Sequence, residues 1–313
     1  MSRAAEGASG DGAEDLLAEA LGYVAAWRGR TVAVKVGGSV LADGVPEGLA
    51  EDLALLHRAG VRTVLVHGGG PEVSGVLEKM GGSPEFVDGL RVTDGETMDV
   101  VVMVLAGRVN KRIVLRLQEA GVRAAGVSGV DAGLLRVRSH PAADRLGRVG
   151  EVERVDPSLV ETLFDGGFLP VVSPVGTDGR GRCFNVNADA AAAALASALG
   201  AEKLVLVTDV EGILRESGGG GVELVSELTP GEARGLIAEG TVSRGMVPKV
   251  EACLAALEKG VHSAHVVGTA TEHAVLRELL TDRGAGTMIR SAPAVGPEDE
   301  RDESTHRIEE TGT

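Results

Sequence analysis

The chain has 313 residues, of which 43% are hydrophobic and 25% are charged. This composition excludes a wholly disordered or fibrous protein, and the length allows one large domain or two modest ones. The formal net charge is −15, and the aromatic residues amount to one Trp, one Tyr and four Phe. A nucleic-acid-binding protein typically has a positively charged surface and aromatic side chains on which bases stack. This acidic chain with few aromatic residues has neither feature, so we expect no nucleic-acid partner.

The two cysteines do not form a CxxC pattern, which argues against both a disulfide framework and a zinc site. We therefore expect reduced thiols, no resident metal site and a cytoplasmic location. No apolar run approaches the roughly 18 residues of a membrane span, so we expect no membrane partner. Both ends of the chain, residues 1–14 and 291–313, are polar and acidic, and we expect them to be disordered tails.

Between the tails, short apolar runs rich in β-branched residues alternate with segments of helical periodicity. This alternation predicts an α/β fold with an open, mainly parallel central sheet sandwiched between helices. The first element, residues 15–30, is an amphipathic helix whose apolar face either folds back on its own domain or pairs with another subunit. We expect strands at 31–36, 62–66, 123–127, 168–175, 203–208 and 264–267, and helices at 47–59, 71–80, 95–119, 156–166, 188–199, 229–239, 248–259 and 271–281.

Three segments depart from this alternation. Residues 134–155 are rich in Arg, Gly and acids and predict an exposed hairpin or lid, and residues 215–223 predict a flexible loop. Turn residues at 176–181 mark a boundary, which divides the folded part into an N-terminal lobe, 31–181, and a C-terminal lobe, 182–290.

Two glycine-rich turns follow the first two predicted strands. Gly37 and Gly38 come after the first strand, and Gly68, Gly69 and Gly70 come after the second. Parallel strands bring both turns to one carboxyl edge of the sheet, where glycines allow a close backbone approach to an anion. Each turn alone is also explained as a tight strand–helix connection, but the pair favours a phosphate site. Neither a P-loop nor a dinucleotide-binding pattern is present.

Several polar residues stand where local structure alone does not favour them. Lys35 interrupts a buried strand, and Lys249 lies in the first turn of a helix, where the helix dipole disfavours a cation. Both positions make sense if an anion lies nearby. Asp189 begins the alanine-rich helix, where it either caps the helix or holds the lysines. Arg91, just before a long helix, has the fork needed to clamp a carboxylate, although a surface role is the simpler interpretation for one Arg alone.

These motifs resemble those of the N-acetyl-L-glutamate kinases, which form part of the amino-acid kinase family. The resemblance covers residues 15–290 and implies ATP-dependent phosphorylation of the γ-carboxylate of N-acetyl-L-glutamate, with Mg²⁺, in arginine biosynthesis. A γ-carboxylate is already ionised at pH 7, so this reaction needs no catalytic base. The motifs that carry the resemblance, in chain order, are KVGG, HGGGP, GLRVT, LAGRVNK, NVNAD, TDVEG and GMVPKV.

The resemblance also implies a role for each of the residues singled out above. Lys35 and Lys249 resemble the lysines that stabilise the phosphoryl group in flight, and Asp189 resembles the carboxylate that positions both. The N-terminal lobe is expected to bind the acyl amino acid and to form a dimer, and the C-terminal lobe to bind ATP. The implied substrate residues are Gly69, Gly70, Arg91 and Asn185, and the implied phosphate and ATP residues are Gly37, Gly38, Gly68, Thr208, Asp209 and Gly212.

Members of this family with a similar N-terminal helix form ring-shaped hexamers and are inhibited by L-arginine. We therefore expect a homo-dimer or homo-hexamer and an arginine effector site that includes Tyr23, His273, Glu278 and Gly284. Two other functions stay open: a kinase for an acetylated or carrier-protein-linked aminoadipate, and a catalytically idle, amino-acid-binding regulatory subunit. The idle subunit predicts the loss of a phosphate-handling residue, and the two lysines and the aspartate are all present.

Overall fold

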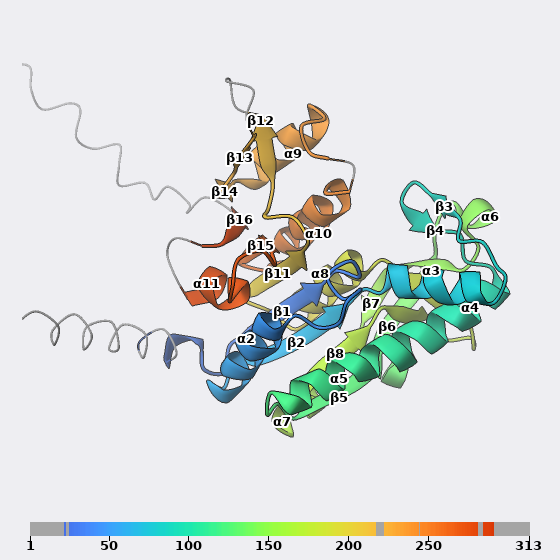
Figure 1. Ribbon diagram of the computed structural model, residues 1–313, viewed down its shortest axis with the longest axis horizontal. Coiled ribbons are helices and arrows are strands. Elements are labelled where there is room, and N and C mark those ends of the chain that lie inside the picture. Colours follow the sequence, from blue (N-terminus) through green and yellow to red (C-terminus); the bar gives the residue numbers. More distant parts are fainter. Residues whose placement is uncertain (1–21, 23–24, 217–221, 244, 281–283, 291–313) are drawn as a thin grey trace, which may run out of the picture.

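A computed structural model of the chain describes residues 22, 25–216, 222–243, 245–280 and 284–290 (Figure 1). The two predicted tails, Tyr23 and most of the predicted helix 15–30 lie outside the described residues. So does the middle of the predicted loop 215–223.

The core is one eight-stranded sheet that passes through both predicted lobes. The strand order is β14-β16-β15-β11-β1-β2-β8-β5, and every neighbouring pair is parallel except β15 with β16. The predicted mainly parallel sheet is therefore confirmed. The strands are β1 (Thr31–Val36), β2 (Arg62–His67), β5 (Ala124–Ser128), β8 (Leu169–Ser173), β11 (Lys203–Thr208), β14 (Glu227–Leu228), β15 (Ser263–Gly268) and β16 (Gly286–Arg290).

Helices cover both faces of this sheet, because successive residues of each buried strand point to opposite sides. In β1, Val32, Val34 and Val36 belong to one hydrophobic core and Ala33 belongs to the other. Figure 1 shows α9 and α10 on one side of β1 and α3 and α4 on the other. The first core holds α2 (Glu47–Arg58), α3 (Gly70–Lys79), α4 (Gly95–Val102), α5 (Asn110–Glu119) and α11 (Ala274–Leu280), and the second holds α7 (Ser158–Asp165), α8 (Ala188–Ala198), α9 (Pro230–Ala238) and α10 (Val247–Glu258).

The long helix predicted at 95–119 is continuous but not uniform. Asp94 caps its start by accepting a hydrogen bond from the Thr97 backbone N–H at 2.8 Å. Between α4 and α5, residues Met103–Val109 form a π-helix, η1, whose wider turn adds a residue to the helical repeat. Periodicity of 3.6 residues does not reveal such a turn, so the sequence predicts the length of this helix and not its interruption.

The segment 134–155 forms the predicted hairpin, with one face buried and the other, arginine-bearing face exposed or half-buried. Its strands, β6 (Leu135–Ser139) and β7 (Val149–Val155), close a small barrel with β9 (Val175–Thr177) and β10 (Cys183–Val186), and α6 (Ala143–Leu146) links them. Leu135, Val137 and Val149 are at most 4% exposed. The arginines that suggested a surface loop alternate with these apolar residues along the strands. The division at residue 181 stays a prediction, and β10 pairs with β7 and β9 across it.

Short elements complete the described fold. The hairpins β3 (Phe86–Val87) with β4 (Leu90–Arg91) and β12 (Leu214–Glu216) with β13 (Val222–Leu224) flank the sheet, and η2 (Asp131–Gly133) is one 3₁₀ turn. Cys183 and Cys253 are both free thiols. In the described part of the chain, no helix has the length and apolar character needed to cross a membrane.

Candidate active site

The two glycine-rich turns meet at the carboxyl edge of the sheet, as the sequence predicts. A Cβ atom placed on Gly38 would lie 2.8 Å from the Gly69 nitrogen and 2.9 Å from the Gly70 nitrogen, and one on Gly68 would lie 2.8 Å from the Gly38 nitrogen. No residue with a side chain fits at these positions. Helix α3 begins at Gly70, so its N-terminal positive potential adds to this cluster of backbone N–H groups.

The two lysines converge on Asp189 beside these turns. The Lys35 Nζ lies 2.7 Å from Asp189 Oδ1, and the Lys249 Nζ lies 3.5 Å from Asp189 Oδ2. Lys35 comes from the central strand β1, Asp189 from the first turn of α8 and Lys249 from the first turn of α10. Burial lowers the pKa of Lys35, Asp189 opposes this shift and Lys249 adds to it. Two cations therefore share one buried carboxylate, an arrangement suited to receiving an anion.

Asp189 is available to the lysines because another residue caps α8. The Asn187 side chain accepts hydrogen bonds from the backbone N–H groups of Asp189 at 2.9 Å and Ala190 at 3.0 Å. Asn187 is thus the N-cap, which excludes the alternative that Asp189 fills this role. Cys253 packs near the same carboxylate, and burial raises the pKa of its thiol, so it stays an unreactive, protonated group.

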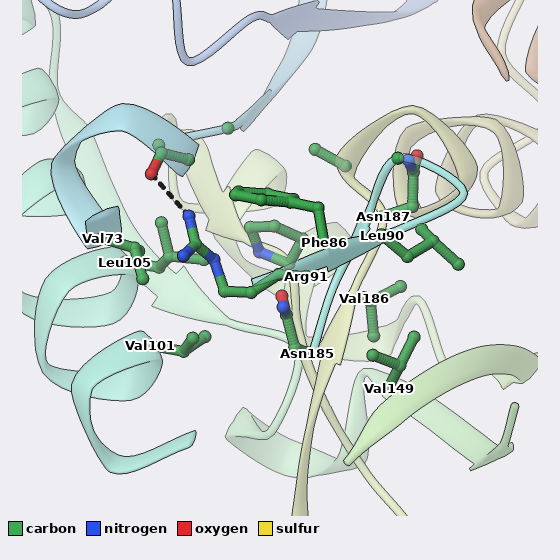
Figure 2. A pocket seen from close by; sticks show the side chains of 16 residues that line it. Val73, Phe86, Leu90, Arg91, Val101, Leu105, Val149, Asn185, Val186 and Asn187 are labelled. Atoms are coloured by element: carbon green, nitrogen blue, oxygen red, sulfur yellow. Dashed lines mark hydrogen bonds between the residues drawn. The ribbon is translucent and has the colours of Figure 1, made fainter. Parts of the chain in front are cut away.

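A hollow of about 660 Å³ opens next to the second glycine turn and is drawn in Figure 2. Arg91 lies along its wall, where its Nη2 donates hydrogen bonds to the Gly70 carbonyl at 2.8 Å and to Ser74 Oγ at 2.7 Å. The guanidinium also stacks on Phe86, with 4.7 Å between Cζ and the ring centre. Its Nη1 is buried without a hydrogen-bond partner among the described residues. This unsatisfied donor fits a carboxylate ligand.

Asn185 lies close to Arg91 in the wall of the hollow (Figure 2). Its Nδ2 donates to Thr93 Oγ1 at 3.2 Å. Apart from Asn187, the other side chains of the wall are apolar, and they include Val73, Val101, Leu105, Val149 and Val186. The hollow therefore combines a guanidinium, an amide and an apolar surface beside the glycine turns. It suits a small carboxylate with an apolar substituent.

The residues predicted to bind the nucleotide follow β11 at the same edge of the sheet. Thr208 Oγ1 donates to Asp209 Oδ1 at 3.0 Å. Burial opposes ionisation of Asp209, but hydrogen bonds from Thr208 and Ser39 outweigh it and hold the pKa of this carboxyl below its ordinary value. Gly212 lines a second hollow of about 640 Å³ together with Ile213, Val242 and Met246. A Cβ on Gly212 would also press on Thr287 Oγ1 at 2.7 Å, so packing alone explains this glycine.

The sequence did not single out every group that shapes these hollows. Ser74, which holds Arg91, and Thr93, which holds Asn185, carried no local signal because their partners are 17 and 92 residues away in the chain. Phe86 is only five residues from Arg91, but their stacking depends on the β3–β4 hairpin, which the sequence analysis did not predict. His67 is fully buried, and burial lowers its pKa to about 4, so the ring is neutral at pH 7. A neutral ring buried at the end of β2 does not suit a proton shuttle.

The predicted effector residues are only partly brought together. A Cβ on Gly284 would lie 3.0 Å from Glu278 Oε2, so these two positions adjoin. Glu278 accepts hydrogen bonds from His265 Nδ1 at 2.6 Å and from the Ala285 backbone N–H at 2.6 Å. His273 instead pairs with Asp52 of α2, with 2.7 Å between Nδ1 and Oδ1.

Comparison with known proteins places this architecture in a family. A model of the amino acid kinase family matches residues 30–268. Acetylglutamate kinase from Halorhodospira halophila is 45% identical over 290 residues, covering 89% of this chain and 95% of that protein. Acetylglutamate kinase from Acaryochloris marina is 47% identical over 275 residues, covering 88% of this chain and 96% of that protein.

Solved structures of other proteins share the fold of this chain. N-acetylglutamate synthase from Neisseria gonorrhoeae, in complex with coenzyme A and N-acetyl-glutamate, superposes with a TM-score of 0.78 at 29% identity, covering 91% of this chain, which spans 64% of the synthase. Carbamate kinase from Giardia lamblia bound to AMP-PNP superposes with a TM-score of 0.64 at 18% identity, covering 84% of this chain and 99% of that one, and shares the fold. The chain described here therefore belongs to the amino acid kinase family.

Proposed function

We propose that this protein is a kinase that transfers the γ-phosphoryl group of ATP to the γ-carboxylate of N-acetyl-L-glutamate. The product is N-acetyl-L-glutamyl 5-phosphate, in arginine biosynthesis. The observation that carries the proposal is the convergence of Lys35 and Lys249 on Asp189 beside two side-chain-free glycine turns. Relatives named acetylglutamate kinase, 45% and 47% identical over most of the chain, support the choice of substrate.

In this mechanism the acceptor carboxylate is the nucleophile, and the protein positions two anions and offsets their repulsion. Arg91 and Asn185 hold the α-carboxylate of the substrate, and Gly69 and Gly70 line the same hollow. Lys35, Lys249 and the N–H groups of Gly37, Gly38 and Gly68 stabilise the charge that develops on the transferred group. Thr208, Asp209 and Gly212 form part of the ATP pocket.

Mg²⁺ is expected to accompany ATP. Among the described residues, no group of three His, Cys, Asp or Glu side chains is placed to hold a metal ion. That fits an ion carried mainly by nucleotide phosphates and water, with at most one or two protein carboxylates, of which Asp209 is the candidate at this edge. When bound, Mg²⁺ would neutralise part of the charge on the phosphates.

The assay follows ADP release together with trapping of the acyl phosphate by hydroxylamine. We expect both signals to depend on acetylglutamate, and to be weaker with N-acetyl-aminoadipate as substrate. A rate of ADP release that does not depend on acetylglutamate would overturn the proposal. Faster turnover of N-acetyl-aminoadipate than of acetylglutamate would favour the alternative kinase. ATP binding without any turnover would favour the idle regulatory subunit.

The finer organisation is also part of the proposal. The N-terminal lobe, 31–181, binds the acyl amino acid, the C-terminal lobe, 182–290, binds ATP, and the chain forms a homo-dimer or homo-hexamer. Exposed apolar side chains on the long helix, Met103 at 55% and Leu115 at 61%, support an oligomer. Light scattering after gel filtration tests this, and a monomer at assay concentration would refute it.

We further propose that L-arginine inhibits the enzyme at a site that includes Tyr23, His273, Glu278 and Gly284. The contact between Gly284 and the buried Glu278 supports the proposal, since a carboxylate is the natural partner of a guanidinium. Millimolar arginine should lower activity in the wild type and have a weaker effect on Glu278→Gln. Unchanged wild-type activity would refute it.

A further inference from the structure

A buried polar network lies directly behind the second glycine turn. Asn110, the first residue of α5, is fully buried. Its Nδ2 lies 2.9 Å from the Val171 carbonyl oxygen and 3.3 Å from His67 Nε2, and its Oδ1 accepts a hydrogen bond from Lys111 Nζ at 3.1 Å. The opposite orientation of the amide would point its oxygen at the carbonyl oxygens of Val171 and Val127, and its nitrogen at the Lys111 ammonium. The contacts therefore fix Nδ2 as the donor toward His67.

This donor determines which ring nitrogen of His67 carries the proton. His67 Nδ1 lies 2.8 Å from the carbonyl oxygen of Gly68, which can only accept, so Nδ1 must hold the hydrogen. Because the buried ring is neutral, Nε2 carries none and accepts from Asn110. Every polar atom of the ring is thus satisfied in one tautomer only.

The tautomer sets the orientation of a peptide group in the proposed phosphate cradle. In a trans peptide, the carbonyl and the following N–H point in opposite directions. Holding the Gly68 carbonyl toward the His67 ring therefore turns the Gly69 N–H away from that ring. The Gly69 nitrogen is one of the two atoms that crowd Gly38, where the two turns meet. The Val36 carbonyl holds the Gly68 N–H at 2.9 Å, and the His67 ring adds a restraint on the peptide that follows Gly68.

The π-helix explains how Asn110 reaches this network. Leu105 lines the substrate hollow, and Asn110, five residues later, contacts His67. The i to i+5 repeat of a π-turn places both on one side of the long helix, whereas α-helical spacing would rotate them apart. Gly126 of β5 leaves the required space, since a Cβ there would overlap Asn110 Oδ1. Lys111 Nζ also donates to the Gly126 carbonyl at 3.0 Å, which closes the network.

From these contacts we infer that Asn110 and His67 are positioning residues, which aim the Gly69 N–H at the transferred phosphoryl group by fixing the Gly68 carbonyl. The part of this inference that concerns phosphoryl transfer rests on the proposed function. The part that concerns the tautomer of His67 does not, because the tautomer is a property of the folded protein alone.

The main test replaces Asn110 by Asp, which keeps the size of the side chain but puts an acceptor opposite His67 Nε2. The new carboxylate favours a proton on Nε2 of His67. A neutral ring with its proton on Nε2 has none on Nδ1, and so it loses the hydrogen bond that orients the Gly68 carbonyl. Removing one backbone donor from an anion site costs about 100- to 1000-fold in kcat, and a misaligned donor should cost about 10- to 100-fold. We expect this loss in kcat, KM values for both substrates within about threefold, and a new pH dependence of kcat between about pH 5 and 8.

A second pair of variants separates the two ring nitrogens. The amide nitrogen in His67→Asn lies close to the position of Nδ1, and that in His67→Gln lies close to the position of Nε2. We expect His67→Asn to keep far more kcat than His67→Gln. The matched control is Thr63→Val in the same strand, because Thr63 is 2% exposed and its hydroxyl has no partner in the described structure. It should leave kcat unchanged.

The activity-independent readout is ¹⁵N NMR of the histidine rings in the wild-type protein. His265 also donates through Nδ1, so the His67 signal is assigned by its absence from the spectrum of His67→Asn. We expect the His67 ring to be in the Nδ1–H form and not to titrate above pH 5, and we expect Asn110→Asp to abolish that signal. An Nε2–H form of the assigned His67 ring in the wild type, equal kcat in the two His67 variants, or wild-type kcat in a folded Asn110→Asp would each overturn the inference. Absence of acetylglutamate kinase activity in the wild type, with the expected tautomer, would instead overturn the proposed function.

Discussion

The shared carboxylate of Asp189 gives the sharpest test of the site. Asp189→Asn keeps the volume of the side chain and removes its charge. Lys35, whose side chain is 5% exposed, loses its ion-pair partner and is left with another ammonium nearby, only the weaker influence of Asp209 and little access to water. Lys249, at 18%, is better placed to be solvated. The substitution therefore affects the buried lysine most.

The distances set the size of the effect. At an effective dielectric constant of about 20, unit charges attract by about 6 kcal/mol at the Lys35 separation and about 5 kcal/mol at the Lys249 separation. Desolvation cancels much of this, and removing one partner of a buried pair typically costs about 3–5 kcal/mol. If this free energy of about 3–5 kcal/mol is lost from the stabilisation of the transition state, kcat falls by about 10²- to 10⁴-fold.

The assay is the pH profile of kcat by coupled ADP release. Burial already lowers the pKa of Lys35, and Asp189 is the largest influence that raises it. Without Asp189 this pKa falls further, so activity that needs the ammonium should disappear at a lower pH on the alkaline side. Asp165→Asn is the control, since its ion pair with Arg62 is 3.7 Å long and its side chain is 80% exposed. A kcat within threefold of wild type, or an alkaline limb that does not move, would refute the reasoning.

Three further expectations follow from the site and its surroundings. Arg91→Lys should raise KM for acetylglutamate about 10- to 100-fold with little change in kcat, because a lysine cannot form two parallel hydrogen bonds, and steady-state kinetics measures both. Gly38→Ala should lower kcat at least about 100-fold, since its Cβ would lie 2.8 Å from the Gly69 nitrogen, whereas Gly75→Ala, with nothing within 4 Å, should not. The unfolded state binds a proton on His67 near pH 6.5 and the folded state only near pH 4, so stability falls as pH drops through that window. Urea unfolding should show a loss of about 2 kcal/mol by pH 5 that is absent in His67→Asn; equal pH slopes for the two proteins would contradict this.

The sequence predicted the parallel part of the sheet well because burial on both faces leaves a plain signal. The bounds of strands β1 and β11 were predicted to the residue; β1 is a short run rich in Val, and β11 is a short run of Val and Leu. Strand β16 was missed because Gly286–Arg290 begins with a glycine and pairs antiparallel to β15 at the margin of the sheet. Its place depends on a pairing that local periodicity does not contain.

The residues of the site likewise fall into those that the sequence could predict and those that it could not. Lys35 and Lys249 were recognisable because each breaks a local rule, one of burial and one of helix polarity, and such violations mark residues held by distant partners. Asn110 breaks no such rule. It looks like an ordinary polar residue inside a predicted helix, and its environment depends on a π-turn and on Gly126, which lie in different segments. Only the three-dimensional arrangement shows that its amide faces carbonyls and a histidine ring.

The two lysines are not equivalent, and their settings suggest different tasks. Lys35 lies in the central strand, hydrogen-bonded in register to β2 on one side and β11 on the other, so neither its backbone nor its buried side chain has room to move. Lys249 lies on the first turn of α10, is more exposed and is 0.8 Å farther from Asp189. A phosphoryl group that arrives between them competes with Asp189 for both cations, and the weaker, better-solvated contact yields first. We therefore expect Lys249 to be the lysine that follows the phosphoryl group, with Lys35 as a fixed point along its path.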